Sequence, residues 1–101
     1  MKRIKVESID HFGELFKEKT IEMTDVIKNS IQEAIDNKKR TANLFEVEIE
    51  GVDTVLGITL NKSQWIDALE TCLKHYEEWE HSDDAIDTYL LIKDLKDGQV
   101  S

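Results

Sequence analysis

The alternation of apolar and polar positions divides the chain into a long helical segment, a pair of strands and two further helices. From residue 9 to about residue 39, apolar residues recur at helical spacing, and Ser8 occupies the position of an N-terminal cap. Gly13 costs a helix interior about 1 kcal/mol relative to alanine. The segment is therefore predicted to be one long helix or two, broken near Thr20 or Thr24, either of which could serve as a cap.

The spacing then changes to the two-residue alternation of strands. Between residues 45 and 50, three apolar residues alternate with three glutamates, the pattern of a strand with one buried and one exposed face. A second alternating run covers residues 56–60, after the turn at Gly51. Residues 2–6 also alternate and could form a short edge strand. The outward glutamates are expected to discourage pairing with another chain.

Loop length sets the register of this predicted β-hairpin. A two-residue loop at 51–52 would place Val47 opposite Leu56. The same register sets Phe45 opposite Ile58, so that both pairs lie on the inner face. A longer loop is the alternative, because the short one brings two acidic residues opposite each other.

The stretch from Leu60 onward has the clearest helical pattern. Asn61 and Gln64 have the spacing of a capping box, and Leu60 and Trp65 flank it where a hydrophobic staple forms. Apolar residues then recur at steps of four and three along one predicted helical face. These residues are Trp65, Leu69, Cys72, Tyr76 and Trp79.

A second C-terminal helix is predicted to begin at Ser82, which would cap it. Asp83 and Asp84 follow in the first turn, where the helix dipole favours negative charge, and Gly98 is the expected stop. The buried side is predicted to comprise Ala85, Ile86, Tyr89, Leu90, Ile92 and Leu95. Because the connection is short, the two helices should form an antiparallel helical hairpin.

Together these elements predict an α+β fold: an N-terminal helical segment, an antiparallel β-hairpin and a C-terminal antiparallel helical hairpin (α-β-β-α-α) around one core. At 101 residues, with 40% hydrophobic and 35% charged content, residues 1–101 are expected to form a single domain. No apolar run approaches the roughly 18 residues of a membrane span. No apolar signal segment follows the basic start. A single cysteine allows no internal disulfide, so a cytoplasmic location is expected.

Charge is divided unequally between the two parts of the chain. Residues 1–40 carry a balance of +1, whereas residues 41–101 carry −10, which together give the net charge of −9. This argues against direct nucleic-acid binding, in which cations meet phosphates. The charge favours a protein partner with a basic surface, or serves solubility alone.

Two short motifs invite a catalytic or metal-binding interpretation. Glu78 and His81 have the spacing that places a carboxylate and an imidazole on one helical face, but a second such pair is missing from the sequence. Cys72 and His75 lie three apart, yet Cys72 falls on the predicted core stripe. We therefore expect no enzyme and no cofactor, and a small metal or thiol enzyme built on these residues is kept as an alternative.

The leading hypothesis is a small non-enzymatic protein-interaction module that binds through its acidic half. The predicted contact residues are Glu77, Glu78, Trp79, Glu80, Asp83, Asp84 and Asp87. Tryptophan is enriched at interface hot spots, although Trp79 could instead staple the two helices together. The alternative hypothesis is a charge mimic of nucleic acid that blocks a DNA- or RNA-binding protein. In size and charge the chain is similar to small acidic proteins with which bacteriophages and mobile elements modulate host factors.

Self-association is a further expectation. The N-terminal stripe has apolar residues on more than one side, including Leu15 with Phe16 and Val26 with Ile27. A core of this size is not expected to cover all of them. The sequence therefore predicts a homodimer, formed through this helical segment or through the edge of the β-hairpin.

Overall fold

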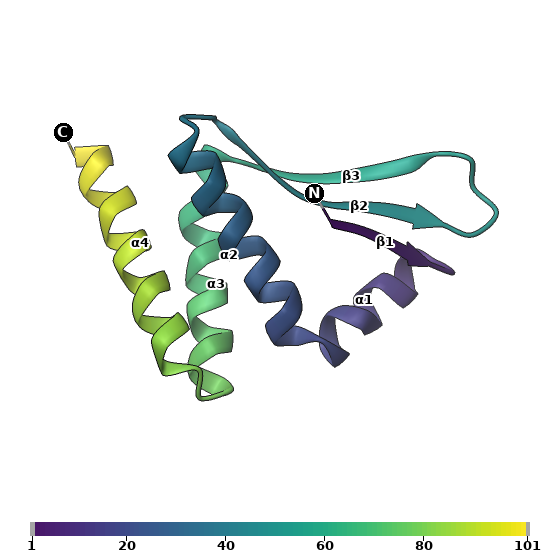
Figure 1. Ribbon diagram of the computed structural model, residues 1–101, viewed down its shortest axis with the longest axis horizontal. Coiled ribbons are helices and arrows are strands. Elements are labelled where there is room, and N and C mark those ends of the chain that lie inside the picture. Colours follow the sequence, from purple (N-terminus) through teal and green to yellow (C-terminus); the bar gives the residue numbers. More distant parts are fainter. Residues whose placement is uncertain (1, 101) are drawn as a thin grey trace.

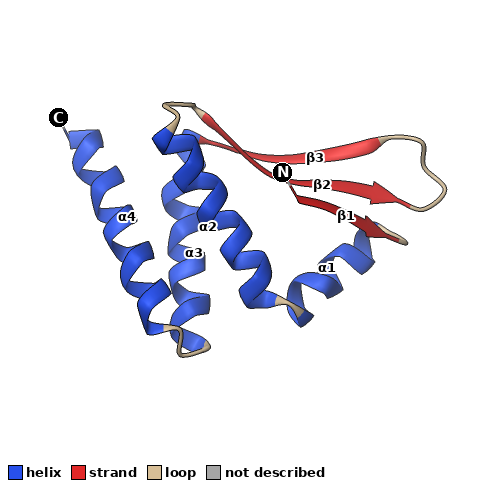
Figure 2. Ribbon diagram, viewed as in Figure 1, coloured by secondary structure: helices blue, strands red, loops and turns tan. Residues whose placement is uncertain are grey.

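The structure, a computed structural model, describes residues 2–100, and within them it contains a three-stranded sheet and four α-helices (Figure 1). In chain order the elements are β1 (Lys2–Val6), α1 (Ile9–Glu18), α2 (Thr20–Asp36), β2 (Thr41–Ile49), β3 (Val55–Asn61), the short 3-10 helix η1 (Lys62–Gln64), α3 (Trp65–Glu78) and α4 (Ser82–Val100). The predicted α+β class is confirmed. Helices α2, α3 and α4 lie side by side at one end, and the β2–β3 hairpin projects away from them (Figure 2).

The N-terminal segment is two helices, and the break between them falls at Lys19. Ser8 caps α1 as predicted, because its side chain accepts a hydrogen bond from a backbone N–H of the first turn. The expectation that Thr20 or Thr24 caps α2 is wrong. The hydroxyl of Thr20 donates back to the carbonyl of Phe16 at 3.0 Å, and Thr24 is fully buried against other elements.

The strand order is β1-β2-β3, so that β2 is the central strand. The weak alternation of residues 2–6 does form a strand, and it pairs in parallel with the second half of β2. Arg3 reaches Glu46 at 2.8 Å, and Lys5 reaches Glu48 at 3.9 Å. The glutamates of β2 therefore do not protect a free edge, as the sequence suggested, because both edges of their strand are occupied.

The predicted register of the hairpin is confirmed. Val47 lies opposite Leu56, and Phe45 lies opposite Ile58. The connection is longer than the two-residue loop, because residues 50–54 lie outside both strands. Gly51 adopts a φ of 82°, a left-handed conformation that glycine accepts without steric cost.

A β-bulge between Asn43 and Phe45 changes which residues of β2 share a face. Ala42 pairs with Leu60, and Phe45 pairs with Ile58, so Leu44 is the extra residue of the bulged strand. With strict alternation, Ala42 and Phe45 would point to opposite faces. The extra residue brings them back into phase, and both are buried.

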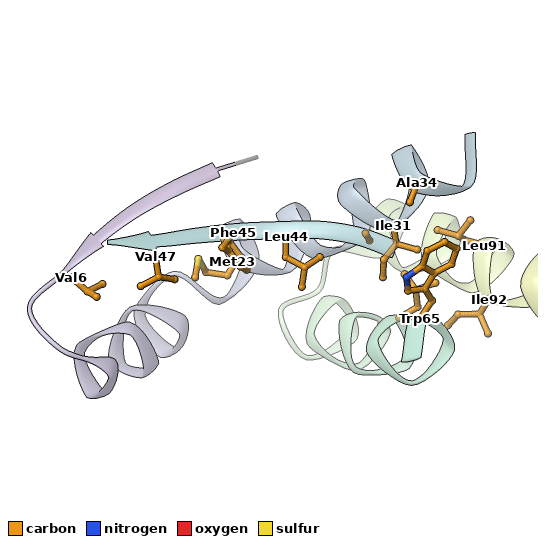
Figure 3. Close-up of a cluster of buried hydrophobic side chains, with 12 residues drawn as sticks. Val6, Met23, Ile31, Ala34, Leu44, Phe45, Val47, Trp65, Leu91 and Ile92 are labelled. Atoms are coloured by element: carbon orange, nitrogen blue, oxygen red, sulfur yellow. The ribbon is translucent and has the colours of Figure 1, made fainter. Parts of the chain in front are cut away.

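Buried apolar side chains form one row along β2. Figure 3 shows this row running from Val6 on β1, past Phe45 and Leu44, to Trp65 on α3 and Leu91 on α4. Helix α2 packs on the sheet on the face of this row, and α1 adds partly buried residues beneath the β1 side of the sheet (Figure 1).

Helix α3 begins as the sequence predicted. The Asn61–Gln64 capping box is present, with the backbone N–H of Asn61 donating to Gln64 Oε1 at 3.0 Å. The indole N–H of Trp65 donates to the carbonyl of Leu60 at 3.0 Å. The residues of the predicted stripe that are buried are Trp65, Leu69, Cys72 and Tyr76.

Helix α4 differs from the prediction at both ends. Ser82 is its first helical residue rather than the cap before it, and Asp83 and Asp84 occupy the first turn as expected. Gly98 does not stop the helix, which continues to Val100. Within residues 2–100, no helix is both long and apolar enough to cross a membrane.

The buried face of α4 was also predicted incorrectly in part. Ile86 and Tyr89 are each 57% exposed, and Leu90 is 50% exposed. Ile92 is buried as predicted, and the other buried positions within residues 82–98 of this helix are Thr88 and Leu91, which were not predicted. Apolar residues surround much of this helix, so its packing partner decides which of them are covered.

Phe45 is the center of an aromatic cluster. Its ring contacts Phe12 and Phe16 edge to face, with centroid distances of 5.9 Å and 6.5 Å.

We expect Phe45→Ala to lower the free energy of unfolding by about 3–5 kcal/mol, because it leaves a cavity in the row. Leu56→Ala, at a position 42% exposed, should cost about 1 kcal/mol or less and serves as the control. Urea unfolding followed by circular dichroism measures both, and equal losses would contradict the assigned core.

Candidate functional site

The seven predicted contact residues gather at one end of the molecule, where α3 ends and α4 begins. We call this surface the acidic tip and define it as Glu77, Glu78, Trp79, Glu80, Asp83, Asp84 and Asp87. Figure 1 places the connection between α3 and α4 at the end of the helices that lies away from β3. Six carboxylates within eleven residues therefore share one region.

Backbone hydrogen bonds fix the turn at the tip. The N–H of Trp79 donates to the carbonyl of His75 at 3.0 Å, and the N–H of His81 donates to the carbonyl of Tyr76 at 2.8 Å. Between them Glu80 adopts a φ of 58°. This left-handed residue followed by a closing hydrogen bond is a common way to end a helix, and it turns the chain toward α4 within three residues.

Trp79 is exposed at the tip. Its relative exposure is 56%, although it continues the stripe on which Tyr76 is fully buried. The prediction that Trp79 staples the two helices together is therefore wrong. The physical reason is that Trp79 is the cap residue at the end of α3, about one turn beyond the buried Tyr76.

Two shallow hollows lie at the tip, and Trp79 lines one of them. Residues lining the first are Trp79, Glu80, His81, Ser82, Asp83 and Asp84. Residues lining the second are Tyr76, Glu77, Glu80, Ser82, Ala85 and Ile86. Because the second hollow extends to Ile86, the acidic surface borders the exposed apolar residues of α4.

Lys28 of α2 divides the acidic residues into two groups. Its ammonium lies 3.7 Å from Asp84 and 3.9 Å from Asp87, and its side chain is only 15% exposed. Asp84 also lies 3.3 Å from the imidazole of His81. Asp84 and Asp87 therefore help to hold α4 against α2, whereas the remaining acids of the tip form no ion pair with Lys28.

Behind the tip, a polar cluster links α2 and α3. The hydroxyl of Tyr76 donates to the carboxylate of Asp25, and the ammonium of Lys28 lies 5.9 Å from the centre of the Tyr76 ring. Burial, together with the bond to the Asp25 carboxylate, raises the pKa of Tyr76 well above its ordinary value. The phenol therefore stays protonated and serves as a fixed donor between the two helices.

The arrangement around Cys72 argues against a thiol nucleophile. The thiol is 1% exposed and its sulfur points at the carbonyl of Thr24, 3.9 Å away. Burial raises the pKa of Cys72 to about 12. His75 lies 3.1 Å from the hydroxyl of Thr24, so Thr24 holds this imidazole in place.

The second motif, Glu78 with His81, is exposed at the tip. His81 lies beside Asp84. Across the part of the chain that the structure describes, no three histidine, cysteine, aspartate or glutamate side chains are grouped so that they could hold a metal ion.

Sequence reasoning missed Lys28, although a signal for it was present. Lys28 lies four residues after Thr24 and three before Ile31, both of which are fully buried. A lysine on the buried face of a helix needs an anionic partner, because isolated charges are costly to bury. The sequence does not indicate which acidic residues supply that partner.

Comparisons of the chain with protein-family models, with curated proteins and with solved structures found no match.

The burial of Cys72 yields a test of the thiol hypothesis. With a pKa raised from 9.0 to about 12, the thiolate fraction near neutral pH is about 1000-fold smaller than in the unfolded chain. Because a thiolate of higher pKa is also more nucleophilic, we expect a disulfide reagent at pH 8 to modify native Cys72 at least about 30-fold more slowly than Cys72 in urea-unfolded protein. Absorbance of the released thiolate measures both rates. Rapid modification of the native protein would contradict the burial and revive the thiol hypothesis.

Proposed function

We propose that this protein is a small non-enzymatic interaction module, in which α3 and α4 form an antiparallel helical hairpin whose acidic tip binds a protein with a basic surface. The observation that carries the proposal is Trp79, exposed among the carboxylates of the tip. Exposing a large aromatic ring to water brings no benefit to folding, whereas buried aromatic anchors supply much of the energy of protein interfaces.

The exposed acids would supply steering and orientation. Glu77, Glu78, Glu80 and Asp83 lie on the exposed surface, and no salt bridge within 4.0 Å forms to any of them within residues 2–100. Complementary charge accelerates encounter and fixes register more than it raises affinity. Asp84 and Asp87 contribute less to such a field, because Lys28 already lies beside both.

The apolar residues of α4 widen the proposed contact. Ile86, Tyr89 and Leu90 are each at least half exposed, and Ile86 lines the hollow next to the tip. The partner we propose therefore combines basic side chains with an apolar strip. A charge mimic of nucleic acid is the alternative, but a mimic needs carboxylates alone, and the exposed aromatic and aliphatic side chains favour protein contact.

The setting we propose is the cytoplasm of a bacterial host, where a phage- or mobile-element-type protein of this size would modulate a host protein. Its support is the small size, the charge of −9 and a single cysteine that is reduced and buried. Reduced cysteines are the rule in cytosolic proteins.

Neutralising the exposed acids tests the proposed surface. The partner is first captured from a bacterial lysate at low salt and identified by mass spectrometry. We then expect Glu78→Gln, Glu80→Gln and Asp83→Asn together to slow association about tenfold at low salt and to flatten its salt dependence, as stopped-flow fluorescence would measure. These three substitutions leave Asp84 and Asp87, which pair with Lys28, unchanged.

The matched control removes the same charge elsewhere. Glu7, Glu14 and Glu18 are exposed and lie outside the tip, so replacing all three by glutamine should change the association rate much less. Equal slowing in both variants would mean that net charge alone acts, and the proposed site would be wrong. Competition between this protein and an oligonucleotide for one site on the partner would support the mimic, whereas simultaneous binding of both would rule the mimic out.

Removing the indole tests the anchor. We expect Trp79→Ala to weaken binding by at least about 2 kcal/mol, roughly thirtyfold, mainly through faster dissociation. Because Trp79 is largely exposed, the free energy of unfolding should change by about 1 kcal/mol or less. Surface plasmon resonance and urea unfolding measure the two quantities. Unchanged affinity would remove Trp79 from the contact.

A further inference from the structure

The two free edges of the sheet differ in chemistry. β1 forms one edge and carries Arg3 and Lys5, and charged side chains of this kind discourage edge-to-edge pairing. β3 forms the other edge, and its seven residues contain neither a charge nor a proline. A long, uncharged edge strand is a template for pairing with another strand.

No strand among residues 2–100 pairs with the outer edge of β3. β2 is the only element among residues 2–100 that packs extensively against it, and Figure 2 shows β3 at the border of the sheet. Val55 is 37% exposed, and Leu56 is also left partly uncovered although it lies on the inner face opposite Val47. This strand therefore has both unpaired backbone and uncovered apolar side chains.

We propose that β3 pairs antiparallel with β3 of a second copy of this chain, so that two three-stranded sheets join across a twofold axis. This inference is independent of the acidic tip and of the function proposed for it. A twofold axis is the usual symmetry of a homodimer, and it requires a surface that is complementary to itself.

β3 meets this requirement in its side-chain pattern. Side chains directly opposite each other in an antiparallel pair lie on the same face, so a twofold pairing sets even-numbered residues against even-numbered ones. The even-numbered residues of β3 are Leu56, Ile58 and Leu60. Aliphatic residues would then meet aliphatic residues across the joint, and the apolar inner face would continue from one copy to the other.

Charge at the two ends of the strand also favours antiparallel self-pairing. Asp53 lies just before β3, and Lys62 follows it directly. Antiparallel pairing brings the Asp53 end of one copy to the Lys62 end of the other. Parallel pairing would instead set like charges together.

The pairing also keeps the acidic tips apart. α3 starts right after η1, at the end of β3, and runs for 14 residues away from the sheet. At 1.5 Å per residue, about 20 Å separates the tip from the end of β3. The other predicted dimer surface offers less apolar area, because its four named apolar residues are partly buried against the core; they are Leu15, Phe16, Val26 and Ile27.

Two lysines on the outer face of β3 test the proposal. Val55→Lys with Thr59→Lys adds like charges to both strands at the joint, where such charges destabilise pairing. The control, Ile9→Lys with Thr71→Lys, makes the same type of change at exposed positions on α1 and α3 and gives the same net charge. Sedimentation equilibrium over a range of concentrations measures the dimer dissociation constant, and circular dichroism verifies folding.

We expect wild-type protein and the control variant to form dimers, and the β3 variant to dissociate with a Kd at least about tenfold higher. A wild-type protein that stays monomeric across the concentration range overturns the proposal. So does a dimer that the β3 variant leaves intact, or that the control weakens equally. If the β3 variant fails to fold, Thr59→Lys alone replaces it, because this outward side chain contributes no core contact.

Discussion

The extra residue at Leu44 is the constraint on which the rest of the structure depends. It corrects the phase of β2, so that Ala42 at one end and Phe45 and Val47 further along all face the helices. In a regular strand, Phe45 and Val47 would point to the face opposite Ala42. With the bulge, β2 supports a continuous row of buried side chains. Helix α2 packs directly on this row, and α3 and α4 contribute side chains at its far end (Figure 3).

Sequence patterns predicted those elements whose signals are local. The capping box at Asn61, the cap at Ser8 and the hairpin register depend on residues near one another in the chain, and each is confirmed. The parallel pairing of β1 with β2 joins residues more than 40 positions apart, so no local sequence pattern predicts it. The orientation of α4 was equally hidden, because apolar residues such as Ile86 and Leu91 lie on opposite sides of it and only α3 selects between them.

The sequence predicted that the acidic residues of the candidate site lie together, but not which of them are exposed or which form ion pairs. Its acids lie within eleven residues of one another, so any compact helix–turn–helix would bring them together. The exposure of Trp79 required knowing where α3 ends, since the periodic stripe alone places Trp79 on the same face as the buried Tyr76. The role of Lys28 required tertiary structure, because this residue comes from a helix 56 positions earlier than Asp84.

The attachment of α4 has a consequence for local stability. This helix packs mainly on α3, and its other contacts are made by Leu91 and Ile92 at the end of the core row and by the ion pairs of Asp84 and Asp87 with Lys28. It can therefore open as a unit of its own while β2, α2 and α3 stay folded, and its amide hydrogens should exchange by such local openings. Three residues of the acidic tip, Asp83, Asp84 and Asp87, lie on this helix, so a ligand held there would slow the opening of the whole C-terminal segment.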